Sequence, residues 1–256
     1  MLIGELAPCV NWPMVIGVGP VATSLLDYLP QRLTLPQDAV LYSSDEAGPS
    51  QPLTFLEQRL TTSDCVLVIV DGSNALAREQ ARYWSQWLLA AKVYFHTTLI
   101  LNTPVNPEDR AWLQDLQPVY IEVLQDKGLP DQLSVTFALL PLLPFLQNGL
   151  CMYDASDLRL VLQTGTHART TAIRWRCTED VTSRLTDAIH RLGQNGCKTA
   201  MLGFNCSVGY TLAEYDTVNN LASQMVGENV LIATFLIHSP DLEEGERELS
   251  VTLVYD

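Results

Sequence analysis

Residues Cys65 to Val70 form an unbroken apolar run, the clearest structural signal in the chain. A strand with one face in water alternates apolar and polar side chains, whereas a strand of a parallel sheet is covered on both faces and does not alternate. A turn at Asp71 to Asn74 follows, and then the spacing of a helix that continues to Ala91. This order of strand, turn and helix predicts an α/β fold built on a parallel sheet.

Similar strand and helix patterns alternate along the first half of the chain. They predict strands at residues 14–19, 39–43, 97–101 and 119–123, and helices at 22–29, 53–61 and 74–91. Such alternation over residues 10–125 predicts a doubly wound open sheet with right-handed crossovers. Residues 131–147 then have the composition of a long apolar helix that contains Pro141 and Pro144, so we expect a central helix within 131–150.

The second half has a different order of elements. It predicts strands at residues 171–177, 198–208, 229–238 and 248–255, and helices at 178–192 and 212–226. The acidic turn 241–246 joins the last two strands, and we expect it to be a solvated hairpin loop. The prediction is thus a doubly wound parallel-sheet domain over residues 1–130, the central helix over 131–150, and a smaller mixed α/β domain over 151–256.

Charge and cysteine spacing exclude several classes of protein. The 15 Lys and Arg against 29 Asp and Glu give a formal net charge of −14, so nucleic acid and anionic membrane surfaces would repel the chain. The 6 Cys and 4 His lack the spacing of a metal or redox site. Residues 1–10 lack the pattern of a signal peptide, and the longest apolar run, residues 135–146, is shorter than the roughly 20 residues of a membrane span. We expect a reduced, cytoplasmic protein without a metal of its own, nucleic-acid binding or direct membrane binding.

A glycine pattern opens the first predicted helix. Gly17-Val-Gly19-Pro-Val-Ala22 follows a strand, and glycines in this context let backbone N–H groups approach a phosphate at the helix N-terminus. With Asp45 or Glu46 at the end of the second strand to bind a ribose, the same pattern fits NAD. The plain alternative is a tight strand-to-helix turn without a ligand, because Pro20 removes one N–H donor.

Two carboxylates three residues apart, Asp154 and Asp157, stand at the start of a short predicted helix. Because they project to adjacent positions, the pair could orient a water molecule. Capping explains the same pair by local energetics alone, with Asp154 at the N-cap and Asp157 in the first turn. Both alternatives stay open at the level of these two residues.

Several segments carry a resemblance to a known family. They are 149–158, Gly165-Thr166, the strand 172–176, the helix from Glu179, the strand 200–206, 210–214 and 250–256. In order and spacing these segments resemble FtsZ, the bacterial member of the tubulin superfamily. Residues 15–19, 42–45 and 98–104 resemble, more weakly, the first glycine loop and two further strands of that family. The resemblance covers nearly the whole chain and is most specific in residues 148–256.

The resemblance implies a GTPase-like domain, a central helix and a C-terminal domain that assemble head to tail, so that a loop of one subunit completes the nucleotide site of the next. Asp154 and Asp157 fall on the two acidic positions of the family's Asn-x-Asp-x-x-Asp loop, which implies a catalytic role on a neighbouring subunit. The positions that would bind GTP, with Mg²⁺ only where GTP binds, correspond here to Gly17, Gly19, Ser24, Asp45, Gly72 and Ser73.

Both glycine loops depart from the family pattern. Pro20-Val-Ala-Thr-Ser24 replaces a nearly all-glycine loop, so side chains and a missing N–H lie where phosphates would approach the backbone. After Val70 the family has Gly-Gly-Gly-Thr-Gly-Thr-Gly, but this chain reads Asp71-Gly-Ser-Asn-Ala-Leu-Ala77. Asp71 is expected to face any triphosphate with its negative charge. Met152 replaces the Asn of the acidic loop.

These departures favour a divergent FtsZ-like pseudo-GTPase that acts by self-assembly, or by docking head to tail on an FtsZ-like partner, in cell division or membrane remodelling. One alternative is an active, assembly-dependent GTPase whose phosphate loop is rebuilt from Thr23, Ser24, Ser73 and Asn74. A further alternative is an NAD-binding Rossmann enzyme. Because the chain ends at Asp256, directly after the last predicted strand, we expect any membrane attachment to need a partner.

Overall fold

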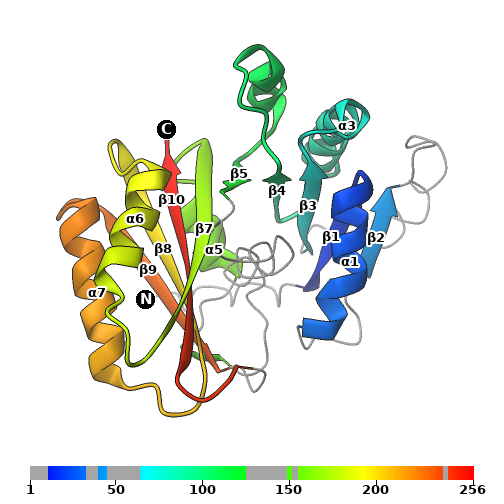
Figure 1. Cartoon of the computed structure of the whole chain (residues 1–256). Helices are drawn as coiled ribbons and strands as arrows, with labels where there is room; N and C mark the ends of the chain where they lie inside the picture. Colours follow the sequence, from blue (N-terminus) through cyan, green and yellow to red (C-terminus); the bar gives the residue numbers. More distant parts are fainter. Residues whose placement is uncertain (1–10, 33–39, 45–63, 125–148, 152–154, 239–241) are drawn as a thin grey trace, which may run out of the picture.

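The computed structural model describes residues 11–32, 40–44, 64–124, 149–151, 155–238 and 242–256 of the 256-residue chain (Figure 1). The helix predicted at 53–61 lies outside these described residues. The central helix, predicted within 131–150, lies outside them up to residue 148, and residues 149 and 150 belong to a strand. Within the described residues, the predicted helices and strands occur in the predicted order, and the structure adds a 3₁₀ helix at Glu108–Asp115 and a strand at Gly149–Cys151 that were not predicted.

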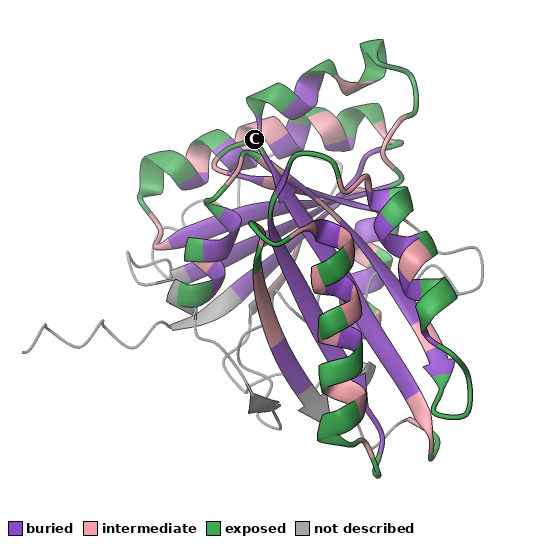
Figure 2. Ribbon diagram, turned by 90° about the vertical axis from the view of Figure 1, so that its left-hand side faces the viewer, coloured by how far each residue is buried: buried purple, intermediate pink, exposed green. Residues whose placement is uncertain are grey.

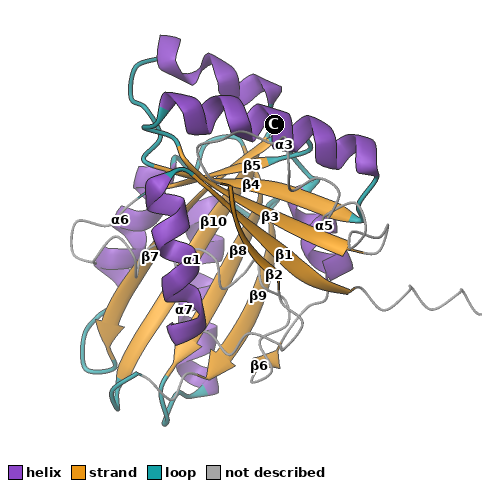
Figure 3. Ribbon diagram, turned by 90° about the vertical axis from the view of Figure 1, so that its right-hand side faces the viewer, coloured by secondary structure: helices purple, strands orange, loops and turns teal. Residues whose placement is uncertain are grey.

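All described strands belong to one mixed sheet. Its strands are β1 (Asn11–Val18), β2 (Val40–Ser44), β3 (Asp64–Asp71), β4 (Phe95–Leu101), β5 (Tyr120–Val123), β6 (Gly149–Cys151), β7 (His167–Arg176), β8 (Cys197–Cys206), β9 (Leu231–His238) and β10 (Glu246–Tyr255). The order across the sheet is β2-β1-β3-β4-β5-β7-β10-β8-β9-β6. Neighbours from β2 to β7 are parallel, whereas β10 is antiparallel to both of its neighbours. Figure 3 shows the strands as one twisted fan, which confirms the predicted α/β class with a largely parallel sheet.

Helices cover both faces of the sheet. They are α1 (Pro20–Arg32), α3 (Ala75–Ala91), the 3₁₀ helix η1 (Glu108–Asp115), α5 (Ala155–Leu162), α6 (Thr182–Leu192) and α7 (Leu212–Val226). One apolar core layer contains residues of α1 and α5 and extends across both halves of the sheet. On the opposite face, α3 and η1 pack over β1, β3 and β4, whereas α6 and α7 pack over β7, β8 and β10. Figure 2 shows the buried residues on the strands and on the inner sides of the helices.

β3 is buried on both faces, as its unbroken apolar run predicts. Leu67 and Ile69 point into the layer under α1, whereas Val66, Val68 and Val70 point into the layer under α3. Each of these side chains is at most 3% exposed. The absence of alternation therefore reflects helices on both sides of a parallel strand.

The two halves of the chain join edge to edge within the sheet. β5 pairs in parallel with β7, and Ile121 lies opposite Ala168 in this pairing. Figure 1 shows α6 and α7 over one end of the sheet, and α1 and α3 over the other. The predicted division of the chain at residues 130 and 150 stays a prediction, because residues 125–148 lie outside the described part.

The last two strands do not form the hairpin predicted around the acidic turn, so that expectation is wrong. β10 lies between β7 and β8, and β9 pairs with β8 and β6 instead. Residue patterns within a strand indicate how it is buried, but not which strand is its neighbour. On β10, Val251 and Leu253 point into one core layer and Val254 points into the other, as suits a central strand.

A polar row crosses three adjacent strands in the second half. Arg174 on β7 and Asn205 on β8 both lie opposite Glu248 on β10. Glu248 is 1% exposed, and its carboxylate accepts hydrogen bonds from Arg174 and, at 2.8 Å, from Asn205 Nδ2. Burial raises the pKa of Glu248 to about 7, although the Arg174 and Asn205 contacts act in the opposite direction.

This raised pKa predicts a loss of stability as the pH increases. A glutamate in an unfolded chain has a pKa of about 4.3, so the folded protein binds the proton more tightly and its contribution to stability disappears as the pH rises from about 4.3 through 7. We expect wild type to lose on the order of 2 kcal/mol between pH 5 and 8 relative to Glu248→Gln. Urea unfolding of both proteins at each pH measures this difference, and parallel curves for the two proteins would contradict the assignment. The comparison cancels other titrations, such as that of His96, whose pKa burial lowers to about 4.

Candidate functional site: a hollow between two helix N-termini

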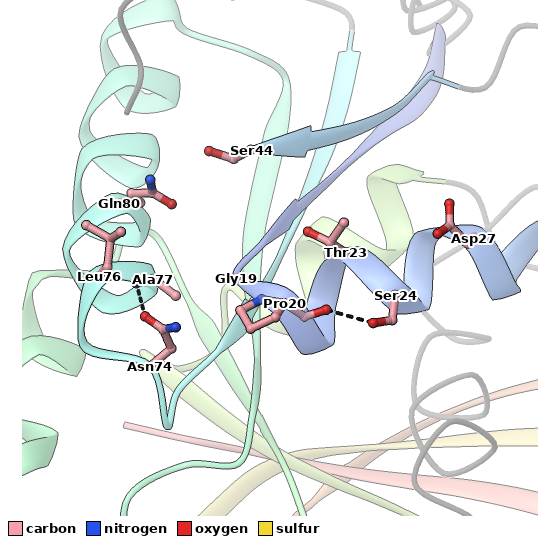
Figure 4. Close-up of a pocket in the computed structure, with 10 residues that line it drawn as sticks. All are labelled: Gly19, Pro20, Thr23, Ser24, Asp27, Ser44, Asn74, Leu76, Ala77 and Gln80. Atoms are coloured by element: carbon pink, nitrogen blue, oxygen red, sulfur yellow. Dashed lines mark hydrogen bonds between the residues drawn. The ribbon is translucent and has the colours of Figure 1, made fainter. Parts of the chain in front are cut away.

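A hollow of about 720 Å³ opens between α1 and α3 at the carboxyl edge of the parallel strands (Figure 4). Ligands of open α/β sheets bind at this edge. The hollow is lined by residues from α1 and the turn before it, from the end of β2, and from α3 and its N-cap: Gly19, Pro20, Thr23, Ser24, Asp27, Ser44, Asn74, Leu76, Ala77 and Gln80. In Figure 4 the side chains of α1 and those of α3 lie on opposite sides of the hollow.

On the α1 side, the Thr23 and Ser24 hydroxyl groups already form hydrogen bonds within the chain. Pro20 begins the helix and has no N–H to offer a ligand. Ser24 Oγ donates to the Pro20 carbonyl at 2.7 Å, and Thr23 Oγ1 lies 3.1 Å from Ser43 Oγ. A phosphate at this turn would therefore compete with hydrogen bonds within the protein.

On the α3 side, the helix N-terminus is capped from within. Asn74 is the N-cap, and its Oδ1 accepts a hydrogen bond from the Ala77 N–H at 3.0 Å. This amide oxygen occupies part of the position at which a bound anion would meet the first-turn N–H groups. Leu76 is 45% exposed in the same turn and presents an apolar side chain to the hollow.

Asp71 is not among the residues that line the hollow, and that it would oppose a triphosphate stays a prediction. Its side chain is 3% exposed, and Oδ1 accepts from Ser73 N–H at 3.2 Å, Ser73 Oγ at 2.7 Å and Asn102 Nδ2 at 3.4 Å. A buried carboxylate needs such donors, and the turn after β3 provides them. Gly72 N–H donates to the Leu101 carbonyl at 2.7 Å, which holds this turn against the end of β4.

Packing alone accounts for the two glycines of the first pattern. A Cβ on Gly17 would lie 2.8 Å from Leu26 Cδ1, so the glycine lets α1 pack closely on β1. Gly19 has φ +89°, and a Cβ there would lie 2.9 Å from the Cβ of Ala77. Gly19 is thus required by its left-handed backbone and by the close approach of the turns before α1 and α3.

The hollow presents polar but largely uncharged groups. Among the described residues that line it, Asp27 is the only charged one. The remaining polar side chains are hydroxyls and amides: Thr23, Ser24, Ser44, Asn74 and Gln80. Two helix N-termini favour an anion, whereas the Asp27 carboxylate disfavours one, and none of the described lining residues is cationic.

No protein-family model and no curated protein matches this sequence. Solved structures do match it. FtsZ from M. jannaschii superposes with a TM-score of 0.70 at 12% identity, and the match covers 94% of this chain and 90% of that one. This chain has the FtsZ/tubulin fold.

Two further structures with the FtsZ/tubulin fold match over a similar extent. CetZ2 from Haloferax volcanii, solved as a GTPγS-bound protofilament, gives a TM-score of 0.61 at 13% identity and covers 96% of this chain and 93% of its own. TubZ from Bacillus thuringiensis serovar israelensis, in GDP-form protofilaments, gives a TM-score of 0.62 at 12% identity. The match covers 96% of this chain and 88% of the TubZ chain. At these identities the likeness establishes the fold.

Within this FtsZ/tubulin fold, the hollow brings together only some of the predicted nucleotide-binding residues. Gly19, Thr23, Ser24 and Asn74 line it. The other described candidates, Gly17, Gly72 and Ser73, are not among the lining residues. Strand and turn patterns in the sequence placed these residues near one edge, but they could not indicate which side chains the turns would bond internally.

The remaining predicted site residues are separated from this hollow or lie outside the described part. Asp45 and Asp154 are outside the described residues. Asp157 is exposed in the first turn of α5, as either capping or a partner contact would require. Ala22 is fully buried on the inner side of α1. With Asp45 not described, the NAD alternative stays a prediction.

The sequence reasoning missed several residues of the hollow: Asp27, Ser44, Leu76 and Gln80. Helical spacing was the available signal for Asp27 and Gln80. Asp27 follows Thr23 by four residues and Gln80 follows Ala77 by three, so each continues the face of its helix that meets the hollow.

Among the described residues, no group of three or more His, Cys, Asp and Glu side chains could hold a metal ion. No helix in the described part is long and apolar enough to cross a membrane.

Proposed function

We propose that this protein is a pseudo-GTPase of the FtsZ/tubulin fold that acts by assembling with itself or by docking head to tail on a related filament. The solved structures with this fold include protofilaments, which supports assembly as its mode of action. Cell division or membrane remodelling is the process in which we propose that it acts.

The composition of the hollow is the observation that carries the proposal. The Thr23 and Ser24 hydroxyls and the Ala77 N–H at the α3 N-terminus are bonded within the chain, and Asp27 is the only charged lining residue described. Phosphoryl binding at such an edge depends on exposed backbone N–H groups and on compensating positive charge. The glycines that remain serve packing instead, which supports loss of nucleotide binding.

Nucleotide binding can be measured directly. We expect no saturable change in the anisotropy of a fluorescent GTP analogue in the presence of Mg²⁺, at protein concentrations from well below to well above micromolar. Saturable binding that competes with unlabelled GTP would overturn the pseudo-GTPase assignment. The titration must extend above micromolar, because a nucleotide site shared between subunits forms only where subunits meet.

Asp154 and Asp157 provide the proposed docking face at the other candidate site. We expect Asp154→Ala with Asp157→Ala to reduce assembly or partner binding at least about tenfold, as measured by sedimentation and light scattering. Glu243→Ala with Glu244→Ala is the matched control, because it removes two exposed acidic charges from the turn before β10. Equal behaviour of the two double variants would attribute any effect to net charge and remove the special role of the Asp154 and Asp157 face.

A working GTPase is the second candidate, favoured by the size and lining of the hollow. A volume of about 720 Å³ is within the range of small-molecule sites, and Thr23, Ser24 and Asn74 all line it. Such an enzyme would rearrange these side chains around Mg²⁺ and GTP. Magnesium-dependent phosphate release that rises steeply with protein concentration would support it, and Asn74→Ala would then lower the rate.

A further inference from the structure

The boundary between the two halves of the sheet contains a buried carboxylate. Glu122 on β5 is 2% exposed and lies beside β7, the first strand of the second half in the sheet order. Arg110 Nη2 donates to both of its oxygens, at 2.8 and 2.7 Å. Arg169 Nε on β7 lies 3.7 Å from Glu122 Oε1 on the other side. One buried charge is thus shared by two arginines from different halves.

The two arginines extend this contact to the neighbouring elements. Arg110 belongs to η1, and its Nη1 donates to the Pro104 carbonyl at 3.3 Å, in the loop that follows β4. Arg169 Nη1 donates to the Leu192 carbonyl, at the end of α6, at 3.4 Å. The Arg110–Glu122–Arg169 triad therefore links η1 and β5 of the first half to β7 and α6 of the second.

An aromatic row reinforces the same boundary. Tyr120, His167 and Tyr255 lie opposite one another on β5, β7 and β10. Their rings stack with centroids 5.8 and 5.1 Å apart. Burial, together with the nearby Arg169, holds the pKa of His167 below its usual value, so the ring stacks as a neutral imidazole at pH 7.

The strand pairing between β5 and β7 is short, although the apolar core layer that contains α1 and α5 also continues across it. β5 has four residues, and it pairs with β7 over Tyr120 to Val123. The Leu124 N–H donates to the Thr170 carbonyl at 2.8 Å, just beyond the strand. So short a pairing gives little stability by itself, whereas a buried carboxylate between two guanidiniums strongly favours the arrangement that keeps all three together.

We infer that the Arg110–Glu122–Arg169 triad holds the two halves of the sheet together as one body. The two halves of the sheet consequently keep a fixed orientation relative to each other. For the proposed assembly, a partner bound at the hollow meets a subunit whose α5 end already has its final orientation. This consequence rests on the proposed function, but the triad's role in joining the halves does not.

Hydrogen exchange tests the triad without any assembly or nucleotide. In Glu122→Gln, a neutral amide cannot hold two guanidiniums, so we expect the amides of residues 120–124 and 167–171 to exchange at least about tenfold faster than in wild type. The amides of β1 and β3, and those of β8, should keep their wild-type rates. Arg82→Gln with Asp115→Asn is the matched control, because this ion pair also involves η1 but is 43% and 52% exposed. In this control variant we expect the amide exchange rates at the β5–β7 boundary to equal those of wild type.

A triple variant separates loss of the triad from exposure of unpaired charge. Arg110→Gln, Glu122→Gln and Arg169→Gln together remove every charge of the triad, and we expect the same faster exchange at the boundary as in Glu122→Gln. Wild-type exchange in the triple variant would overturn the inference, because the single variant would then have acted only through two unpaired arginines. Uniformly faster exchange over the whole chain would also overturn it. Since the measurement uses dilute monomer, failed assembly does not affect its outcome.

Discussion

Replacing Arg247 by Met is expected to destabilise the protein by about 3 kcal/mol and to lower its melting temperature by roughly 10 °C. Arg247 is 2% exposed on β10, and its Nε lies 3.2 Å from Glu214 Oε1. Its Nη1 donates to Ser207 Oγ at 2.9 Å, and the guanidinium lies 5.1 Å from the centre of the Tyr210 ring. Loss of this cation leaves the Glu214 carboxylate without its charge partner and the loop before α7 without its anchor. Urea and thermal unfolding measure the effect.

Arg176→Met is the matched control for this experiment. Arg176 also forms an ion pair, with Glu243 at 2.8 Å, but the two side chains are 58% and 72% exposed. Water screens such a pair, so a change below about 1 kcal/mol is expected. Similar losses for the two variants would mean that burial of Arg247 does not determine its contribution.

Gly165→Ala is the second substitution with a large expected effect, a destabilisation of about 3 kcal/mol. A Cβ on Gly165 would lie 1.9 Å from the Tyr255 carbonyl oxygen and 2.5 Å from the carbon of that carbonyl. Because these are backbone atoms, no side-chain rotation can relieve the overlap. The adjacent Thr166 N–H donates to the same carbonyl at 2.7 Å, so the end of β10 would have to move away from this turn. Urea unfolding at neutral pH measures the loss.

Gly209→Ala provides the comparison for the cost of backbone conformation alone. Gly209 has φ +85°, and nothing lies within 4 Å of a Cβ built there. The left-handed backbone should cost about 1 kcal/mol with alanine, without any steric overlap. A Gly165→Ala variant no less stable than Gly209→Ala would contradict the close packing of the turn against β10.

Much of the secondary structure could be predicted because its signals are local. The helix predicted at residues 212–226 is α7, with the same bounds. A capping box explains this agreement, since Thr211 Oγ1 accepts from the Glu214 N–H and the Glu214 carboxylate accepts from the Thr211 N–H. For η1 there was no such signal, because a 3₁₀ helix over residues 108–115 has neither a side-chain cap nor a clear apolar period.

The candidate site could be predicted only in part. The glycine at position 19 and the polar residues Thr23, Ser24 and Asn74 did mark the edge of the sheet at which the hollow lies. The Asp71 carboxylate accepts its two shorter hydrogen bonds from Ser73 within the same turn, whereas the contact with Asn102, which reaches it from the end of β4, could not be predicted. The Asn102 donor is remote in sequence, and no local pattern indicates a contact of that kind.

The amino-acid sequence alone determined the α/β class, the buried character of β3 and the limits of α7, since each depends on side chains within a few residues of one another. The tertiary structure decided where β10 lies in the sheet, how Asn102 reaches Asp71, and how Glu122 joins β5 to β7. These features depend on contacts between residues that are far apart in the chain. Such contacts form only when the strands are packed side by side, so no local pattern in the sequence contains them.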